Sequence, residues 1–441
     1  MKHRSFLLIA VVLFVVSCTG TSSDTTATTA PTTAVPSTET TSTEPPATTS
    51  TTLDLPVRPD GIEALSPEMQ QEILDLIAVT EEIRGLRFLQ PPIIVVVTPE
   101  ELAERVRASI SEEIGDVPAD EALLKVLGLL DPEVDLLQLY LDLYGEQVAG
   151  YYDGDVGELV VPAGDSFSEL QKATLVHELV HALTDQRFGF NDTYESLIDE
   201  QRFDEAVAFL AVIEGDATLT EVQYIQRLSL ESQQALLAEL FGTDSPVFDS
   251  VPEFLQNSLV FPYEQGLVFV QRAFEIGGFD EVNRLYVEPP VSSEQIIEPR
   301  DYQRDMPVEV SVVPPALSGY EVVFESVWGE LGFALMFDQV LGGADAAVSG
   351  WGGDAYVQWF DGTDAALLLT YRGDEPSDLD EMYEALVAYA STMAVDGSED
   401  FAGGILFEGD DFAFVRVTGD SVTFVAAGTP VTGRQIVASL P

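Results

Sequence analysis

The sequence predicts an α+β protein: a mainly helical part with a small β-hairpin or sheet, followed by a C-terminal α+β part. Three observations predict this class. Apolar residues recur at helical spacing through much of residues 66–276, a β-branched run occupies 93–97, and helical and strand patterns alternate from residue 319 onward. With 441 residues, of which 46% are hydrophobic, the chain can bury a sizeable core in two or three domains.

The first residues are predicted to be a targeting segment. Two basic residues precede an apolar stretch at 6–16, which is too short for an ordinary transmembrane helix. The stretch ends in Ser17 and Cys18, and a small residue directly before a cysteine resembles a bacterial lipoprotein lipobox. The resemblance implies cleavage of residues 1–17 and lipidation of Cys18, which would anchor an extracytoplasmic protein to the cell membrane. An ordinary signal peptide that happens to contain a cysteine is the alternative.

Three folded parts are predicted after a stalk. Residues 18–54 are almost wholly Thr, Ser, Pro, Ala and Glu after the cysteine, and such a segment cannot bury apolar surface. We therefore expect a disordered, flexible stalk there. The folded parts are an N-terminal helical region with a strand (55–146), a central part (147–315) and a C-terminal α+β domain (316–441).

Individual elements follow from periodicity and from breakers. Before the central part, helices are predicted at 66–86, 99–114, 119–130 and 133–144, with a strand at 93–97. Two β-prone runs flank Asp153-Gly154-Asp155, which predicts a hairpin at 147–162. Further helices are predicted at 204–228, 231–241, 252–256 and 263–276, and residues 286–315 are proline-rich and irregular.

A helix start is predicted directly before the run LQKATLVHELVHALTDQRF. Ser166 fits as the N-cap of a capping box, with Glu169 at the third helical position. This places residues 177–181 inside a helix.

His177, Glu178 and His181 form an HExxH motif on that helix. Residues four apart lie on one helix face, so both imidazoles can reach a single metal ion. Zinc at such a site lowers the pKa of its bound water and polarises a carbonyl group, and Glu178 is placed to accept the proton. Of the three histidines in the chain, only His3 lies outside the motif. The alternative is a pair of hydrogen-bonded histidines on an ordinary buried helix.

The third ligand of a catalytic zinc site must then be a carboxylate, since such sites use three protein ligands. Glu214 is the best candidate, because an acidic pair with Asp216 inside an apolar stretch is costly to bury unless it is paired or bound to metal. Asp216 is the nearest rival. Asp185, one turn beyond His181, is expected either to orient a ligand histidine or to be exposed. Gly215 is expected to let another backbone approach closely.

Two further features of the site stay open in the sequence. An oxyanion needs a donor, which can be a tyrosine, an arginine or a backbone amide. The candidate tyrosines are Tyr151, Tyr152, Tyr263, Tyr286 and Tyr302. The hairpin at 147–162 fits equally well as an edge that pairs with an extended substrate and as a plain packing hairpin.

The runs GYYDGDVGELVV, TLVHELVHALTDQ and IEGDAT resemble a group of bacterial HExxH proteins classed as gluzincin-like zinc metallopeptidases. The resemblance covers about residues 60–390 and is most specific around the metal helix. It implies His177 and His181 as metal ligands, Glu178 as the general base and Glu214 as the third ligand.

Two later stretches also resemble that group, with one departure each. They are YVEPPVSSEQIIEPRDY at 286–302 and SGWGGDAYVQWF at 349–360. Members of the group tend to have histidine where Glu298 stands and a basic residue where Ala355 stands. No role for these two positions follows from the resemblance.

Three functions are compatible with these patterns, and nucleic-acid binding is excluded by the formal net charge of −57. The first is a Zn²⁺-dependent peptidase that acts on peptides or proteins at the outer cell surface. The second is a non-catalytic surface lipoprotein, in which Trp351, Tyr356 and Trp359 could bind a ligand, although aromatic residues at such spacing are more often core. The third is a zinc amidase acting on cell-wall peptides, whose chemistry is the same.

Overall fold

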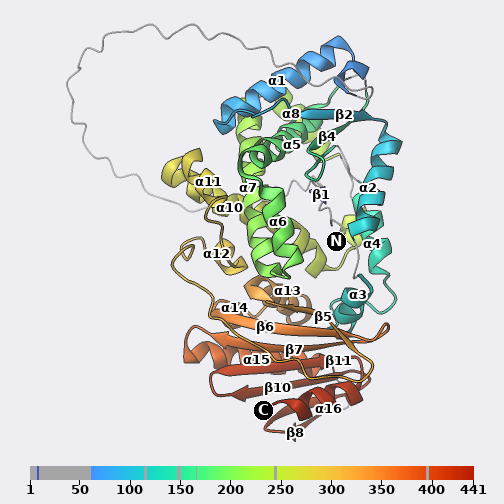
Figure 1. The fold of residues 1–441 in the computed structure, drawn as a ribbon, viewed down its shortest axis with the longest axis vertical. Helices are drawn as coiled ribbons and strands as arrows, with labels where there is room; N and C mark the ends of the chain where they lie inside the picture. The colour runs from blue at the N-terminus through green and yellow to red at the C-terminus, as the bar shows by residue number, and fades with distance from the viewer. Residues whose placement is uncertain are drawn as a thin grey trace, which may run out of the picture.

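The computed structural model describes residues 7–8, 61–113, 117–146, 150–164, 166–242, 246–393 and 397–441. Cys18, the stalk and all of the expected signal peptide except residues 7–8 lie outside these ranges. In the described ranges, no helix has the length and apolarity that a membrane crossing requires. A helical part with a small sheet lies above a larger sheet in Figure 1, so the predicted α+β class is confirmed.

The small sheet has four strands in the order β1-β3-β4-β2. The predicted strand at 93–97 is β2 (Ile93–Val97), which runs parallel to β4 (Glu158–Pro162). The predicted hairpin is formed by β3 (Tyr151–Asp153) and β4, and both predictions are confirmed. The outer edge of β3 pairs antiparallel with the two-residue strand β1 (Leu7–Leu8).

Helix α1 (Pro67–Arg84) covers this sheet and the metal helix. Ser66 caps its start by accepting a hydrogen bond from the backbone N–H of Met69, and Gly85 ends it with a positive φ of 72°. Its fully buried residues Ile73 and Ile77 pack with residues of β2, β4 and α5 in one hydrophobic cluster.

Helix α5 (Glu169–Phe188) carries residues 177–181, but its capping box lies two residues later than predicted. The Oγ atom of Ser168 accepts a hydrogen bond from the Gln171 N–H at 3.1 Å, and Oε1 of Gln171 accepts one from the Ser168 N–H at 2.9 Å. The prediction that Ser166 and Glu169 form the capping box was wrong, because the run SFSELQ contains two pairs with the capping-box spacing, Ser166 with Glu169 and Ser168 with Gln171. Phe167 is buried in the core beside α5, so the chain turns into the helix only after it.

Helices α7 (Phe203–Arg227) and α10 (Glu253–Gly277) cross at a pair of glycines. A Cβ atom on Gly215 would lie 2.2 Å from the carbonyl oxygen of Gly266, and one on Gly266 would lie 2.2 Å from that of Ala211. The close approach expected at Gly215 is therefore confirmed. Two separate helices were predicted at 252–256 and 263–276, and this was wrong, since α10 runs on through Pro262. Packing against α7 outweighs the cost of about 3 kcal/mol that an interior proline imposes.

Gly266→Ala is expected to destabilise the protein by about 1–3 kcal/mol, because an overpacked core must shift backbone to make room. The matched control is Gly164→Ala, where the added Cβ would be no closer than 3.8 Å to its nearest neighbour. Urea unfolding of both variants measures the difference. Equal midpoints for the two variants would show that α7 and α10 can separate without cost.

The remaining helices before the large sheet are short or lie around these elements. They are α2 (Pro99–Glu113), α3 (Val117–Val126), α4 (Leu136–Glu146), α6 (Phe190–Asp199), α8 (Leu230–Leu240), α9 (Pro246–Ser250), α11 (Phe279–Leu285) and α12 (Ser293–Ile297).

The large sheet is antiparallel, with seven strands in the order β5-β6-β7-β11-β10-β9-β8. The strands are β5 (Glu321–Ser326), β6 (Trp351–Phe360), β7 (Ala365–Gly373), β8 (Ser398–Phe401), β9 (Gly404–Glu408), β10 (Phe412–Thr418) and β11 (Ser421–Ala427). Both faces of its centre are covered. In β7, Leu367 and Leu369 belong to one hydrophobic cluster and Leu368 to another, which explains an apolar run without alternation.

Helices cover both faces of this sheet. One face packs against α13 (Gly329–Leu341), α14 (Asp345–Val348) and α15 (Pro376–Met393), and the other against α16 (Pro430–Ser439). Trp351, Tyr356 and Trp359 are at most 7% exposed, so these aromatic residues belong to the core.

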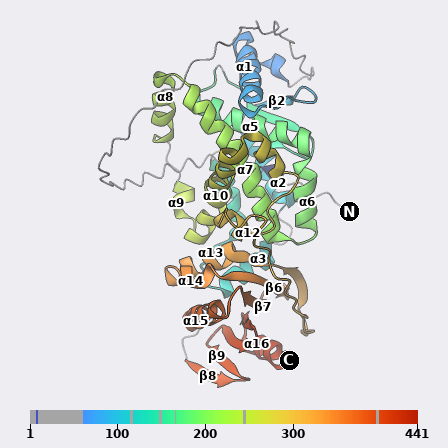
Figure 2. The same ribbon diagram turned by 90° about the vertical axis from the view of Figure 1, so that its left-hand side faces the viewer.

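Helix α3 also packs on this sheet, although it precedes the metal helix in sequence. Leu123 and Val126 join the cluster on the α15 face, and Gln358 donates a hydrogen bond to the carbonyl oxygen of Ala119 at 2.9 Å. Figures 1 and 2 both show α1 at one end of the molecule and α3 beside the large sheet. Residues 61–146 thus contact both ends of the fold.

Candidate metal centre

Helices α5 and α7 bring His177, His181 and Glu214 into one buried group. One ligand atom of each residue lies within 4.8 Å of the others. Oε2 of Glu214 lies 3.0 Å from Nε2 of His177 and 3.5 Å from Nε2 of His181. The two imidazole rings meet edge to face, with their centroids 4.7 Å apart. This group can hold a metal ion.

Several buried polar atoms of the group have no hydrogen-bond partner among the described residues. They are both ring nitrogens of His181 and Oε1 of Glu178. Leaving a buried polar atom unpaired costs about 1–3 kcal/mol, so such atoms point to a missing partner. Nε2 of His177, Nε2 of His181 and Oε2 of Glu214 are donors that one divalent metal ion can bind together, and the residues present therefore fit a metal.

The charges of the metal-free group are strongly coupled. Burial by itself lowers the pKa of His177, but Glu214 and Glu221 raise it to about 10. Burial by itself raises the pKa of Glu214, but His181 and His177 lower it to about 2. Burial lowers the pKa of His181, which favours the neutral imidazole that a metal requires. A metal that binds here must displace a proton from His177, so its affinity should rise with pH.

Glu221 is a partner of the group that sequence reasoning missed. Its Oε2 lies 3.3 Å from Nδ1 of His177, the ring nitrogen that faces away from Glu214. Glu214 and Glu221 are seven residues apart on α7 and so share a helix face, which was the available signal. A carboxylate on the second ring nitrogen fixes the orientation and tautomer of a metal-binding histidine.

Asp185 does not have either of its two expected roles. It is half-buried, and its Oδ2 and Oδ1 accept hydrogen bonds from the Tyr152 hydroxyl at 2.7 Å and the Asn191 N–H at 3.1 Å. No hydrogen bond from His181 reaches it in the described part of the chain. Both expectations were wrong because Asp185 is used to fasten α5 to the hairpin.

Glu178 lies against the hairpin as well as beside the ligand group. Its Oε2 accepts a hydrogen bond from the backbone N–H of Tyr152 at 2.8 Å, while Oε1 is free in the described structure. Burial is the largest cause that raises the pKa of Glu178, to about 8 in the metal-free protein. A carboxyl group that titrates near neutral pH is suited to proton transfer.

Among the five candidate tyrosines, Tyr263 on α10 is the one whose ring contacts a ligand histidine in the described structure. Its half-buried ring stacks on His177, with centroids 6.1 Å apart and an interplanar angle of 26°. The other hydroxyls have different partners or surroundings: Tyr152 donates to Asp185, Tyr286 to Asp216 and Tyr302 to the backbone of Glu288, while Tyr151 packs in a hydrophobic cluster.

Asp216, the rival third ligand, faces away from the metal group. Its Oδ1 lies 2.8 Å from Nε of Arg84, and both side chains are completely buried. Its Oδ2 also accepts a hydrogen bond from the Tyr286 hydroxyl at 2.9 Å. The guanidinium of Arg84 lies over the ring of Phe279, 4.6 Å from its centroid. Asp216 therefore ties α7 to α1, and Glu214 is the carboxylate that meets the histidines.

The two later stretches singled out in the sequence lie at the junction between the helical part and the large sheet. Asp354 accepts hydrogen bonds from the backbone N–H groups of Trp328 and Gly329 at 2.7 and 2.9 Å. Asp204 on α7 accepts one from the N–H of Ser293 at 3.2 Å. The N–H of Leu331 on α13 donates a hydrogen bond to Oγ of Ser293 at 3.1 Å, which ties the helical part to the C-terminal part, and none of these residues belongs to the metal group.

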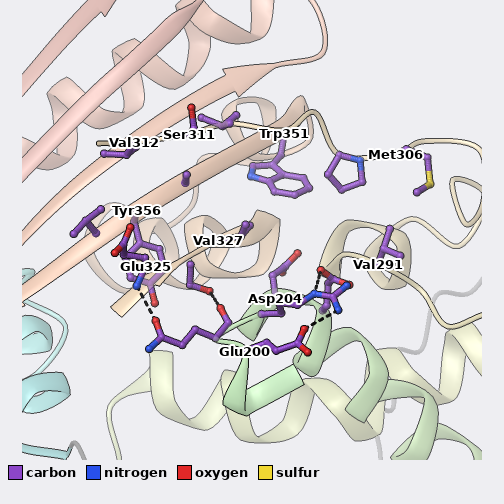
Figure 3. Close-up of a pocket in the computed structure, with 18 residues that line it drawn as sticks. Glu200, Asp204, Val291, Met306, Ser311, Val312, Glu325, Val327, Trp351 and Tyr356 are labelled. Atoms are coloured by element: carbon purple, nitrogen blue, oxygen red, sulfur yellow. Dashed lines mark hydrogen bonds and ion pairs between the residues drawn. The ribbon is translucent and has the colours of Figure 1, made fainter. Parts of the chain in front are cut away.

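A large cavity lies at the same junction, away from the metal group (Figure 3). Its volume is about 600 Å³, and none of the four HExxH-site residues lines it. Figure 3 shows Glu200 and Asp204 on one side and Trp351 and Val312 on the other. The cavity and the metal group are thus separate sites.

Comparisons with known proteins add little to this geometry. A family model described as a domain of unknown function (DUF8575) matches residues 320–436, which form most of the large sheet and its helices. No curated protein matches the chain. A solved structure from Chloroflexus aurantiacus, described as a proposed hydrolase with a novel fold, is 18% identical, with a TM-score of 0.37 over 56% of this chain and 90% of that chain. A likeness this weak supports no conclusion about fold or activity.

Proposed function

We propose that the protein is a zinc-dependent peptidase that hydrolyses peptide bonds at the outer cell surface. The observation that carries the proposal is the meeting of His177, His181 and Glu214 in one buried group, with Glu178 beside it. Two imidazole nitrogens and a carboxylate oxygen, with room for one more ligand, are the donor set of catalytic zinc sites.

Zinc in this group would supply a water of lowered pKa and would polarise the substrate carbonyl. The chain supplies the rest. Glu178 is held by the Tyr152 N–H through Oε2, so Oε1 is free to accept a proton and to pass it to the leaving amine. Glu221 orients His177, and Tyr263, which stacks on that histidine, is the candidate donor to the oxyanion.

The edge of β3 is the proposed binding place for an extended peptide. It lies directly beside Glu178, because the Tyr152 N–H of this strand donates to that carboxylate. Residues 7–8 pair antiparallel with β3, so this edge is able to hold an extended backbone. Residues 7–8 belong to the expected signal peptide, and its cleavage would free the edge for a peptide or protein substrate.

Lipid on Cys18 remains the proposed link to the membrane, and it implies that substrates are met outside the cytoplasm. Cys18 lies outside the described residues, so this proposal rests on the lipobox-like sequence. Mass spectrometry of the protein extracted with detergent tests it. An unmodified Cys18 at the mature N-terminus, or its complete removal, would contradict lipidation.

Zinc stoichiometry is the first test of the metal site. Wild type is expected to hold one tightly bound zinc, Glu214→Ala to lose it, and Glu221→Gln to bind about 10–100-fold more weakly, since partners of ligand histidines have effects of that size. Glu231→Gln, on the exposed surface of α8, is the matched control. No zinc in wild type would overturn the enzyme proposal in favour of non-catalytic binding. Unchanged zinc in Glu214→Ala would overturn its role as third ligand.

A further inference from the structure

A second group of carboxylates lies where α12 and the large sheet meet. Glu294 is on α12, Asp305 is in the loop that follows it, and Asp374 comes directly after β7. One carboxylate oxygen of each lies within 4.8 Å of the others. Glu294 is only 5% exposed, whereas Asp374 is on the surface, so the group is closed on one side and open to water on the other.

Glu330, in the first turn of α13, is a buried carboxylate beside this group. It is 4% exposed, and its Oε2 has no hydrogen-bond partner among the described residues. Burial, followed by the charges of Glu330, Asp305 and Asp374, raises the pKa of Glu294 to about 9, so Glu330 is the charged residue that acts most strongly on Glu294. A buried, unpaired carboxylate oxygen beside a group of three other carboxylates lacks a positively charged partner.

The described part of the chain supplies no such partner. None of the ion pairs in the described part of the chain includes any of these four residues. Like charges at this separation repel strongly where water is partly excluded. A bound cation removes that repulsion and places a positive charge beside the free oxygen of Glu330.

We propose that this group is a calcium site, with Glu294, Asp305 and Asp374 as ligands and Glu330 beside them. All donors are oxygen atoms, which hard cations prefer, and no histidine or cysteine takes part. Two oxygens that bind one Ca²⁺ at about 2.3–2.6 Å can be as much as about 5 Å apart, so the observed spacing allows direct coordination. The open side at Asp374 leaves room for the waters that complete a calcium shell.

The neighbouring backbone is arranged to keep these ligands in place. Nε2 of Gln295 donates a hydrogen bond to the carbonyl oxygen of Asp305 at 2.6 Å, which fixes the loop. The N–H of Val308 donates a hydrogen bond to the carbonyl oxygen of Gly352 in β6 at 2.7 Å, which fixes the loop to the sheet. Gly352 also packs closely on the Asp374 side chain, since a Cβ atom on Gly352 would lie 2.8 Å from Oδ1 of Asp374. The segment that starts at Asp305 then forms one wall of the 600 Å³ cavity, so bound calcium would also order that wall.

Calorimetric titration of Ca²⁺ into the chelator-treated, zinc-reloaded full chain tests the proposal. One site is expected, with a Kd of about 10⁻⁴–10⁻³ M, as in extracellular calcium modules. Glu294→Gln and Asp374→Asn should each weaken binding at least about tenfold, since ligand charge sets affinity. The matched control Glu309→Gln, on the exposed surface of the same segment, should bind as wild type does.

Thermal unfolding distinguishes a variant that has lost its calcium ligand from a variant that fails to fold. At about pH 10 and without calcium, Glu294→Gln should unfold at a higher temperature than wild type, because Glu294 is charged above its raised pKa of about 9 and the variant removes that charge. With calcium, wild type and Glu309→Gln should gain stability and Glu294→Gln should not. Glu214→Ala should bind Ca²⁺ normally, which separates this site from the zinc site. No Ca²⁺ binding to wild type, or equal binding to wild type, Glu294→Gln and Asp374→Asn, would overturn the proposal.

Discussion

Glu178→Gln is expected to reduce peptide hydrolysis by about 10²–10⁴-fold, the usual contribution of a general acid–base residue, while zinc stays bound. Glutamine keeps an oxygen that can accept the Tyr152 N–H bond, so the hairpin and α5 should stay in contact. It cannot accept a proton at the atom that replaces the free Oε1. Because Glu178 is not one of the three ligands, metal content is the internal control.

Casein and a synthetic cell-wall peptide are the two substrates to compare. Hydrolysis of casein by wild type and not by Glu178→Gln would support the peptidase. Activity on the cell-wall peptide alone would favour the zinc amidase. Unchanged hydrolysis in Glu178→Gln would contradict the assigned base, whichever substrate is used.

Arg84→Leu is expected to lower the free energy of unfolding by about 3–5 kcal/mol, the usual effect of removing one partner of a buried ion pair. Arg84 and Asp216 are both completely buried and lie 2.8 Å apart. Without the guanidinium, the Tyr286 hydroxyl is the one hydrogen-bond donor that the described residues leave to the charge of Asp216. The stacking of Arg84 on Phe279 would also be lost.

The control is Arg227→Leu, which breaks an ion pair with Glu82 whose side chains are 45% and 71% exposed. Exposed pairs contribute about 0–1 kcal/mol, so urea unfolding should separate the two variants clearly. Adding Asp216→Leu to Arg84→Leu should recover part of the loss, because no buried charge then lacks a partner. Equal losses for Arg84→Leu and Arg227→Leu would contradict the buried pair.

Local sequence patterns were sufficient for the helix of the HExxH motif and for the β-hairpin that precedes it in the sequence. The spacing of His177 and His181 needs only helix geometry. Glu214 could be selected because a glutamate in an apolar helix must find a partner, and the structure places it against both histidines.

Contacts between distant segments could not be predicted in the same way. The partner of Asp216 is Arg84, which is 132 residues away along the chain, and no periodicity encodes such a pair. The group of Glu294, Asp305 and Asp374 is likewise formed by three segments that only the tertiary fold brings together. Among five tyrosines, only the packing of α10 on α7 could single out Tyr263, because it brings the Tyr263 ring against His177.

Breaker residues misled the sequence analysis where tertiary packing dominates. Separate helices were predicted at 252–256 and 263–276, on either side of Pro262, but α10 continues because Gly266 lets it pack directly on α7. Local rules describe what one element costs by itself, and they cannot weigh that cost against contacts made elsewhere.

The burial of Arg84 under Phe279 bears on how this protein could mature. Many secreted peptidases are made with an N-terminal segment that blocks the active site and is later cut away. Here, removal of the chain through the end of α1 would take away Arg84 and leave the buried charge of Asp216, two residues from Glu214, without its ion-pair partner. It would also expose the apolar residues of α5, β2 and β4 that α1 covers. Helix α3 is similarly fixed to the large sheet. We therefore expect no maturation cut downstream of α1, and the protein with α1 in place to be the active form.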